Sequence, residues 1–258
     1  MGAESASAEK PLKERINLLK VPLDIVRPDN LEDAVYEILS DGNSEKGKNI
    51  VLLSLWDLLR ARRNNEYRGY VLNASLVIPI SKSLVSGSRF LTRKTPCRYM
   101  PFNFAVTLLT ILEKKELTVY LLGGRSRILQ KTENNIRQTF PGLRIVGRHV
   151  SPFRRQEEAG IIEAIRKAAP HLLLVGKGAR GGEVWIGRNN ARLGQGLKFW
   201  CSDLFDVFAK KKRRPSEAVF ERGLEGIVYC FRNPAKFFRL FPYLHYKLLL
   251  LVYKLRRS

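Results

Sequence analysis

Short apolar runs alternate with amphipathic segments along most of the chain. The apolar runs are strand-like and occupy residues 16–26, 49–55, 75–80, 117–124, 143–147 and 171–178. Between them lie segments whose apolar residues recur at helical spacing, at residues 29–42, 56–72, 103–115, 125–140 and 155–169. We expect the first of these helices to open with a capping-box pair, Asp29 and Glu32, and to end at Gly42.

Several of the strand-like runs are apolar at consecutive positions, as in NIVLL and HLLLV. Strands of this kind are buried on both faces, which is typical of a parallel sheet covered by helices on its two sides. The pattern therefore predicts an α/β protein with a doubly wound, mainly parallel sheet.

Two of the predicted strands end in glycine turns that lead into a helix. One turn contains Gly123 and Gly124, and the other has the spacing Gly176-x-Gly178-x-x-Gly181. Glycines at such a turn allow the backbone to approach a phosphate, but a plain tight turn needs glycine for the same conformational reason. The spacing matches a dinucleotide fingerprint, yet that motif normally lies in the first βαβ unit. We therefore favour another phosphate-bearing ligand over NAD.

The charge balance narrows the classes of partner. The chain of 258 residues has 46 Lys and Arg against 24 Asp and Glu, a net charge of +22, and a pI near 10.2. Such an excess predicts a polyanionic partner, either nucleic acid or an anionic membrane surface. The three cysteines and three histidines show no metal-ligand or disulfide spacing, so we expect no metal site and a reducing compartment.

The character of the chain changes after about residue 210. Residues 226–258 contain seven Lys or Arg and no acid, with eight interleaved aromatic residues. This composition fits bases stacked along a phosphate groove or a helix lying in a lipid interface, and the leucine block near residue 250 favours the membrane. A helix packed on its own or a partner subunit is the remaining alternative. The expected contacts to lipid phosphate are Lys210, Lys211, Lys212, Arg213, Arg214, Arg232, Lys236 and Arg239.

Domain boundaries follow from these shifts in composition. Residues 1–12 have no apolar signal-peptide core and are expected to be a disordered lead. Residues 13–209 form the predicted α/β domain, and residues 210–258 form a basic, aromatic-rich helical appendage. The longest uncharged run, residues 99–112, has 14 residues, whereas a membrane-spanning helix needs about 18.

Five sequence blocks, in order, resemble the bacterial WecG/TagA/CpsF glycosyltransferases, from about Leu18 to Leu240. The blocks are YLLGG, PGLRIVGRH, LLLVGKGARGGEVWIGRNNARL, LFDVFAKKKRRP and RGLEGIVYCFRNPAKF. The family versions look like FLLGG, PGLRIVGTH, LLLVGLGAPKQEKWI, AFDFLAGKVKRAP and GLEWLYRLLQEPRR. The resemblance implies a Rossmann-like domain with a helical appendage at the membrane. It also implies transfer of an N-acetylhexosamine from a UDP-sugar to a lipid-diphosphate acceptor.

Carried over residue by residue, the resemblance implies a donor site with changed polar groups. The proposed catalytic aspartate of the family falls on Ile80, and the glycine after it falls on Ser81. Arg98 and Glu183 are retained and become the candidate catalytic residues. The expected nucleotide-sugar contacts are Ser54, Gly123, Gly124, Gly176, Gly178, Arg180 and Asp206.

Glycosyl transfer needs a proton acceptor for the attacking hydroxyl and positive charge for the departing diphosphate. Isoleucine accepts no proton, so Asp57 or Glu183 would have to serve as base. The chain has no DxD motif in the expected site, so we predict metal-independent chemistry without a cofactor, with Arg98, Arg180 and Arg213 as candidates to stabilise the leaving group.

Three functional hypotheses follow. The first is an active glycosyltransferase, peripheral on the inner face of the bacterial cytoplasmic membrane and able to form homo-oligomers. The second is a catalytically inactive relative that binds a nucleotide sugar or a lipid phosphate as a scaffold or regulator. The third, and least favoured, is a nucleic-acid-binding protein that uses its charge alone.

Overall fold

The main body of the protein is built on a six-stranded sheet in which every recorded strand pairing is parallel. The computed structural model describes residues 11–41, 48–179, 181–213, 216–223 and 240–256. The strand order is β4-β3-β8-β7-β5-β6. The strands are β3 (Asn49–Leu53), β4 (Leu76–Pro79), β5 (Thr118–Leu122), β6 (Arg144–His149), β7 (Leu172–Val175) and β8 (Leu197–Trp200). The doubly wound α/β prediction is confirmed.

Successive side chains of the central strands enter two separate hydrophobic cores. In β7, Leu173 and Val175 pack in one core, whereas Leu172 and Leu174 pack in the other. This division follows from the twofold alternation of side chains along a strand. It explains why the strands are apolar at consecutive positions.

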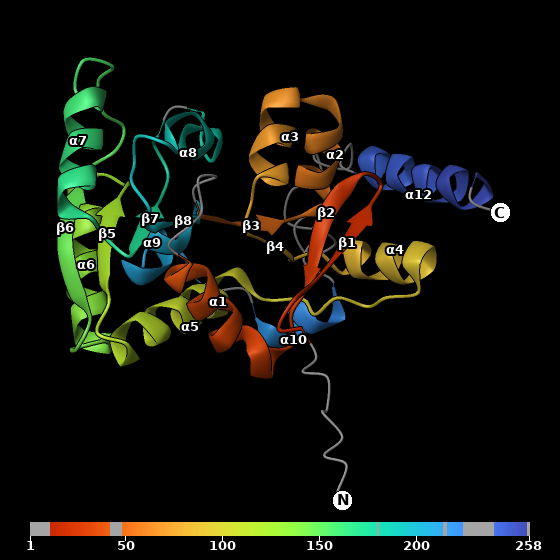
Figure 1. Ribbon diagram of the computed structural model, residues 1–258, viewed down its shortest axis with the longest axis horizontal. Coiled ribbons are helices and arrows are strands. Elements are labelled where there is room, and N and C mark those ends of the chain that lie inside the picture. Colours follow the sequence, from red (N-terminus) through yellow and green to blue (C-terminus); the bar gives the residue numbers. More distant parts are fainter. Residues whose placement is uncertain (1–10, 42–47, 180, 214–215, 224–239, 257–258) are drawn as a thin grey trace, which may run out of the picture.

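Helices cover both faces of the sheet, as Figure 1 shows, with α7, α8, α3 and α2 on one side and α6, α9, α5 and α1 on the other. A short 3-10 turn (Pro28–Asn30) precedes the first helix. The helices are α1 (Leu31–Ser40), α2 (Leu55–Arg63), α3 (Asn65–Leu72), α4 (Lys82–Thr92), α5 (Pro101–Lys114), α6 (Ser126–Thr139), α7 (Glu158–Ala168), α8 (Val184–Asn189), α9 (Leu204–Phe208), α10 (Glu217–Arg222) and α12 (Leu240–Leu255).

The first strand-like run, residues 16–26, is a hairpin and not a single strand. Strands β1 (Glu14–Leu18) and β2 (Val21–Ile25) pair antiparallel in a sheet of their own. The buried Asp24 carboxylate accepts hydrogen bonds from Arg15 Nε at 2.7 Å and from the Val77 amide at 2.6 Å, so it links the hairpin to β4. The single-strand expectation was wrong because Leu19 and Lys20, which form the turn, are not typical turn residues.

Two helix boundaries also differ from expectation. The helix expected over residues 56–72 is two helices, because Asn64 has extended dihedral angles and its side chain accepts a hydrogen bond from the Tyr67 amide at 2.8 Å. The Asp29–Glu32 capping box is not formed: α1 begins at Leu31, and its N-cap residue, Asn30, makes no side-chain capping bond. Asp29 lies instead in the preceding 3-10 turn.

Helix α4 was not among the expected elements, and it supports the C-terminal helix. Tyr246 of α12 is fully buried and its hydroxyl donates to the Ser83 carbonyl at 2.9 Å. Gly87 permits this contact, because a Cβ there would lie within 2.9 Å of the Tyr246 ring. Helix α12 therefore packs on the α/β domain through one face. Within the described part of the chain, no helix combines the length and apolar character needed to span a bilayer.

Candidate active site

A crevice opens where two neighbouring strands of the sheet diverge. The structure describes all of β3 and β8, and these strands pair at only two positions, Asn49–Lys198 and Ile50–Phe199. Beyond these pairs, at the carboxyl ends of the strands, lies a cavity of about 350 Å³. Ligands of doubly wound folds bind in this position. The cavity is lined by Ile50, Val51, Leu52, Asp57, Tyr67, Tyr70, Ile80, Pro101, Glu183, Trp200, Cys201 and Ser202.

Asp57 is held in this crevice by the first turn of α2. Ser54 is the N-cap residue, and its amide and hydroxyl donate to Asp57 Oδ2 at 2.9 and 2.5 Å, which forms a reciprocal capping box. The box satisfies amides at the start of the helix and fixes the carboxylate at the end of β3. The side chain of Ser54 therefore has a structural partner, and its expected contact with a nucleotide stays a prediction.

Glu183 reaches the same crevice from the start of α8. Its Oε1 atom lies 2.5 Å from Nη1 of Arg60, and its side chain is only 16% exposed. The Arg60 guanidinium carbon is also 4.2 Å from the centroid of the Tyr67 ring. Carboxylate, guanidinium and aromatic ring thus form one contiguous group, of which Glu183 and Tyr67 line the crevice.

Two tyrosines of α3 form the buried wall. Burial raises the pKa of both Tyr67 and Tyr70 far above that of a free phenol. Glu183 raises both values further and Asp57 raises that of Tyr67, so both hydroxyls remain protonated. The Tyr70 hydroxyl is buried without a hydrogen-bond partner among the described residues. A buried polar group in this state is suited to bind a ligand or an ordered water.

Ile80 lines the crevice directly after β4, and its amide donates to the Leu53 carbonyl at 2.9 Å. The Ile80 side chain therefore makes this part of the crevice wall apolar. The next residue, Ser81, has a structural role, because its hydroxyl accepts a hydrogen bond from the Leu55 amide at 3.1 Å. Ser81 therefore supports the start of α2, and the correspondence of Ile80–Ser81 with the family's Asp-Gly pair stays a prediction.

The two glycine turns pack against each other. The amides of Gly123, Gly124 and Gly176 donate to the carbonyls of His149, Lys177 and Leu122, at 3.0, 3.0 and 2.7 Å. A Cβ at Gly123 would lie 2.8 Å from the Gly176 backbone, and Gly123 has a φ of +141°. These turns therefore require glycine for close packing, and three amides are occupied. Their contact with a nucleotide stays a prediction.

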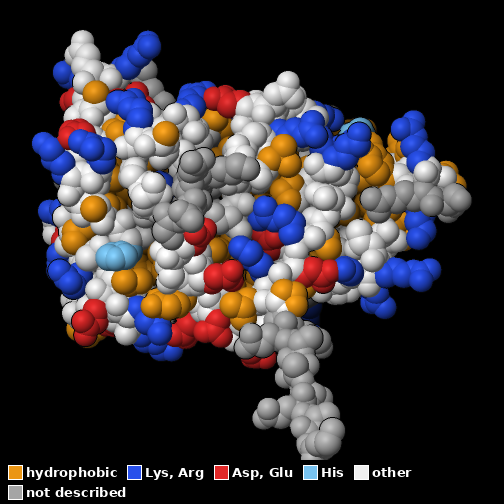
Figure 2. All heavy atoms as spheres, in the orientation of Figure 1, with side chains coloured by type: hydrophobic (Ala, Val, Ile, Leu, Met, Phe, Trp, Pro, Cys, Tyr) orange, Lys and Arg blue, Asp and Glu red, His pale blue; other side chains and the backbone are white. Residues whose placement is uncertain are grey.

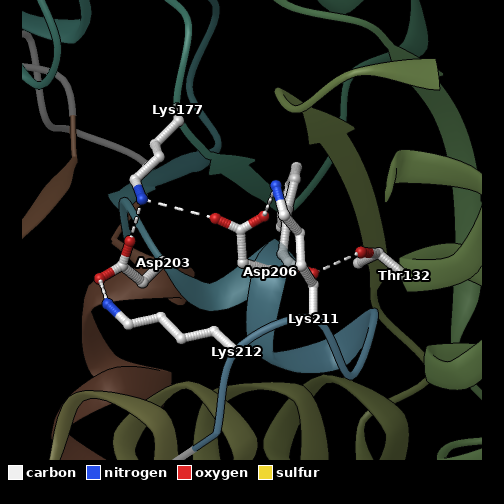
Figure 3. Close-up of polar contacts among 7 residues, drawn as sticks. Thr132, Lys177, Asp203, Asp206, Lys211 and Lys212 are labelled. Carbon is white, nitrogen blue, oxygen red and sulfur yellow. Dashed lines mark hydrogen bonds and ion pairs between the residues drawn. The ribbon is translucent and has the colours of Figure 1, made fainter. Parts of the chain in front are cut away.

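A chain of alternating charges lies beside these turns, as Figure 3 shows. Lys177 follows β7 and points between Asp203 and Asp206, which also pair with Lys212 and Lys211 respectively. Partial burial opposes ionisation of Asp203, but the two lysines together lower its pKa. The Asp203 carboxylate is thus held ionised at the carboxyl edge of the sheet.

The structure places two of the other predicted residues, Arg98 and Arg213, apart from the crevice lining. Arg98 donates to the Phe220 carbonyl and its guanidinium carbon is 3.7 Å from the centroid of that ring. Arg213 is exposed. Five residues lie outside the described part of the chain: Arg180, Arg214, Arg232, Lys236 and Arg239. In the described part, no three His, Cys, Asp or Glu side chains gather as a metal site requires, and metal independence stays a prediction.

Sequence reasoning missed Arg60 and the tyrosines of α3. Tyr67 and Tyr70 lie three residues apart on a helix, and this spacing is the same as that of an ordinary core stripe. Arg60 lies among four arginines between residues 60 and 68. Nothing in the chain distinguishes it from a solvated surface residue before its contacts are known.

The fold is a doubly wound α/β architecture with a crevice at the carboxyl ends of β3 and β8, and comparison with known proteins gives its family. A model of the Glycosyl transferase WecG/TagA/CpsF family matches residues 16–258, so the chain belongs to this family. Two relatives carry the name N-acetylglucosaminyldiphosphoundecaprenol N-acetyl-beta-D-mannosaminyltransferase. The protein of Bacillus spizizenii is 22% identical over 198 residues, 77% of this chain and 76% of the relative. That of Bacillus subtilis is 20% identical over 191 residues, 74% of each chain.

Proposed function

We propose that the protein transfers an N-acetylhexosamine from a UDP-sugar to a lipid-diphosphate-linked acceptor, with the crevice between β3 and β8 as the reaction site. The names of the two relatives support an N-acetylhexosamine as the transferred sugar and a lipid-diphosphate-linked acceptor. The observation that carries the proposal is the presence of two carboxylates, Asp57 and Glu183, in one crevice. On the expected alignment Ile80 falls on the family's aspartate, so one of these carboxylates would be the base.

The proposed reaction forms one bond and breaks another at the same carbon. The acceptor hydroxyl oxygen bonds to the anomeric carbon of the donor while the bond from that carbon to the diphosphate oxygen breaks. The hydroxyl proton passes to a carboxylate, and UDP leaves with the electron pair. Asp57 suits the role of base because its two side-chain hydrogen bonds in the described chain both use Oδ2. Its Oδ1 atom is then the one available to the acceptor.

Glu183 and Arg60 are suited to stabilise the leaving group and not to accept the proton. Glu183 lines the crevice and is already ion-paired with Arg60, so its carboxylate holds that arginine beside the crevice. The Arg60 side chain is 41% exposed and retains donors that can face a diphosphate. A guanidinium at this position would stabilise the negative charge that develops on the leaving group.

The test is a transfer assay with UDP-N-acetylhexosamines and a lipid-diphosphate acceptor. Asp57→Asn keeps an oxygen for the capping box but removes the base, so we expect kcat to fall by about 10²–10⁴-fold. Glu183→Gln should weaken donor use by a smaller factor, seen mainly in KM. Glu163→Gln, at an exposed site on α7, is the matched control and should leave both parameters unchanged. An Asp57→Asn protein with wild-type kcat would exclude Asp57 as base.

A second candidate function is a catalytically inactive relative that binds the nucleotide sugar as a scaffold or regulator. Ile80 favours it, because this residue lines the crevice and accepts no proton, and on the expected alignment it replaces the family's aspartate. Calorimetry with UDP separates the candidates. Saturable UDP binding without turnover on any UDP-N-acetylhexosamine would support the second candidate, whereas turnover would exclude it.

We further propose that the protein works on an anionic membrane surface through α12. The exposed side of this helix carries Phe241, Leu244, Leu248, Leu251 and Leu255, with exposed fractions between 54 and 76%. Figure 2 shows Lys and Arg side chains around the α12 end of the molecule. Apolar side chains next to cations are what an interfacial helix presents to acidic lipids. Flotation with anionic vesicles should recover the protein, and preferential recovery on duplex DNA would support the nucleic-acid hypothesis instead.

A further inference from the structure

A second cavity, of about 510 Å³, lies at the tip of the β1–β2 hairpin. The described residues that line it are all different from those that line the crevice between β3 and β8. Three elements far apart in sequence form it: the hairpin turn, the end of α4 and the last turns of α12. The lining residues are Asn17, Leu19, Lys20, Leu91, Tyr253 and Arg256.

Arg62 of α2 holds this cavity together. Its Nη1 atom donates to the Leu19 carbonyl at 2.6 Å and to the Tyr253 hydroxyl at 3.2 Å. The same guanidinium lies 5.3 Å from the centroid of the Tyr253 ring. One arginine therefore fixes the hairpin turn relative to α12 without any ligand, which reduces the entropy that a ligand must lose on binding.

Positive charge converges on the Tyr253 hydroxyl. The hydrogen bond from Arg62 lowers the pKa of Tyr253, and the charges of Arg62, Lys20 and Arg256 lower it further, although slight burial opposes this. Among the described residues that line the cavity, none is acidic. An anion placed beside this hydroxyl would therefore meet positive charge from three different parts of the chain.

Lys20 lies in the hairpin turn at a position where Asn or Gly is usual. Leu19 and Lys20 have φ values of +52° and +67°, in the left-handed region that Asn and Gly tolerate best. Leu19 is 2% exposed, so core packing explains its presence. Lys20 is exposed and receives no such compensation. Strain retained at a polar residue of a cavity is typical of a binding position.

We propose that this cavity binds the phosphate group of an anionic phospholipid headgroup. Lys20 and Arg256 would donate to the phosphate oxygens, while Arg62 and Tyr253 hold the site in shape. The surface around the cavity indicates that the phosphate belongs to a lipid. Leu248, Leu251 and Leu255 are exposed on the same last turns of α12, on the face opposite Tyr253. A helix that inserts such an apolar face lies about 5–10 Å deep in the headgroup and acyl boundary, so its opposite face, with the cavity, would lie at the level of the headgroup phosphates. The site does not depend on glycosyl transfer in the crevice.

The first experiment titrates the full chain with a short-chain phosphatidylglycerol below its micelle concentration, followed by calorimetry. We expect saturable binding of one lipid per chain. Lys20→Gln and Arg256→Gln should each weaken it about fivefold, the effect of one cation at a lipid surface. Lys247→Gln is the matched control, because Lys247 is also exposed on α12 but does not line the cavity. It should change the affinity by less than about twofold.

A second variant separates binding from folding. Lys20→Gly removes the cation and also relieves the left-handed strain, so the melting temperature should rise while lipid affinity falls. A purely structural role for Lys20 would move both measurements in the same direction. Absence of saturable binding, or an equal loss in Lys247→Gln, would overturn the proposed site. Inorganic phosphate that binds as tightly as the short-chain lipid would overturn the headgroup assignment.

Discussion

Glycine is required at position 178 for two reasons, a positive φ and close contacts with Ser151 and Pro152. Its φ is +111°, and a Cβ there would lie 2.6 Å from Ser151 Oγ and 2.8 Å from the Pro152 nitrogen. Gly178→Ala should therefore lower the free energy of unfolding by about 2 kcal/mol or more. Gly160→Ala is the control, because Gly160 lies exposed in α7 and an added Cβ would meet nothing within 4 Å. It should stabilise by about 0.5–1 kcal/mol. Urea unfolding measures both, and equal stability of the two variants would contradict the packing role of Gly178.

Lys198 gives the protein a pH dependence in the alkaline range. Burial lowers its pKa from 10.5 to about 8, with a further contribution from Lys48. Between pH 8 and 10.5 the unfolded chain therefore binds more protons than the folded one. The free energy of unfolding consequently rises with pH in this range, because the buried amine loses its charge. Lys198→Met should be more stable than the wild type at pH 7, by about 1–3 kcal/mol, and this difference should shrink toward pH 10.5. Urea unfolding of both proteins across this range tests it. A pH-independent difference would show that Lys198 is charged to the same extent in both states.

At the scale of elements, symmetric burial made the central strands predictable. β5 and β7 consist mainly of residues buried on both faces, and apolar runs of that kind have few alternatives. Helix α4 was missed because its segment is rich in serine and includes Gly87, which disfavours a helix locally. Its packing against Tyr246 compensates, and that contact joins residues too distant for any local pattern to show.

The caps of two helices give a matched test of local interactions. Asn64 caps α3 through a 2.8 Å bond from the Tyr67 amide, whereas Asn30 caps α1 without a side-chain bond. We expect Asn64→Ala to lower the free energy of unfolding by about 1 kcal/mol and Asn30→Ala to change it by less than about half of that. Chemical denaturation of both variants measures the difference. Equal effects would mean that the Asn64 bond adds nothing beyond helix propensity.

At the scale of the whole molecule, the architecture was predictable and the crevice was not. The sequence names Asp57 and Glu183 as carboxylates that could replace the missing aspartate, and both line the crevice. The crevice itself arises because β3 and β8 separate after two residue pairs, and Tyr67 and Tyr70 fill its wall from α3. The two strands are far apart in the sequence, at Asn49–Leu53 and Leu197–Trp200. No periodicity along either strand reports their divergence.

Charge and apolar surface should contribute separately to membrane binding. Salt screens the attraction between the basic surface and acidic lipids, whereas burial of apolar side chains is little affected by it. Vesicle binding of the wild type should therefore weaken between about 0.1 and 0.5 M salt, and the binding that remains should come from α12. Leu248→Gln combined with Leu251→Gln removes two exposed leucines and leaves the buried Tyr246 contact in place. This variant should bind at low salt and lose binding at high salt, while Leu72→Gln, an exposed leucine on α3, serves as the control. Identical salt curves for the α12 variant and the wild type would show that α12 does not enter the lipid interface.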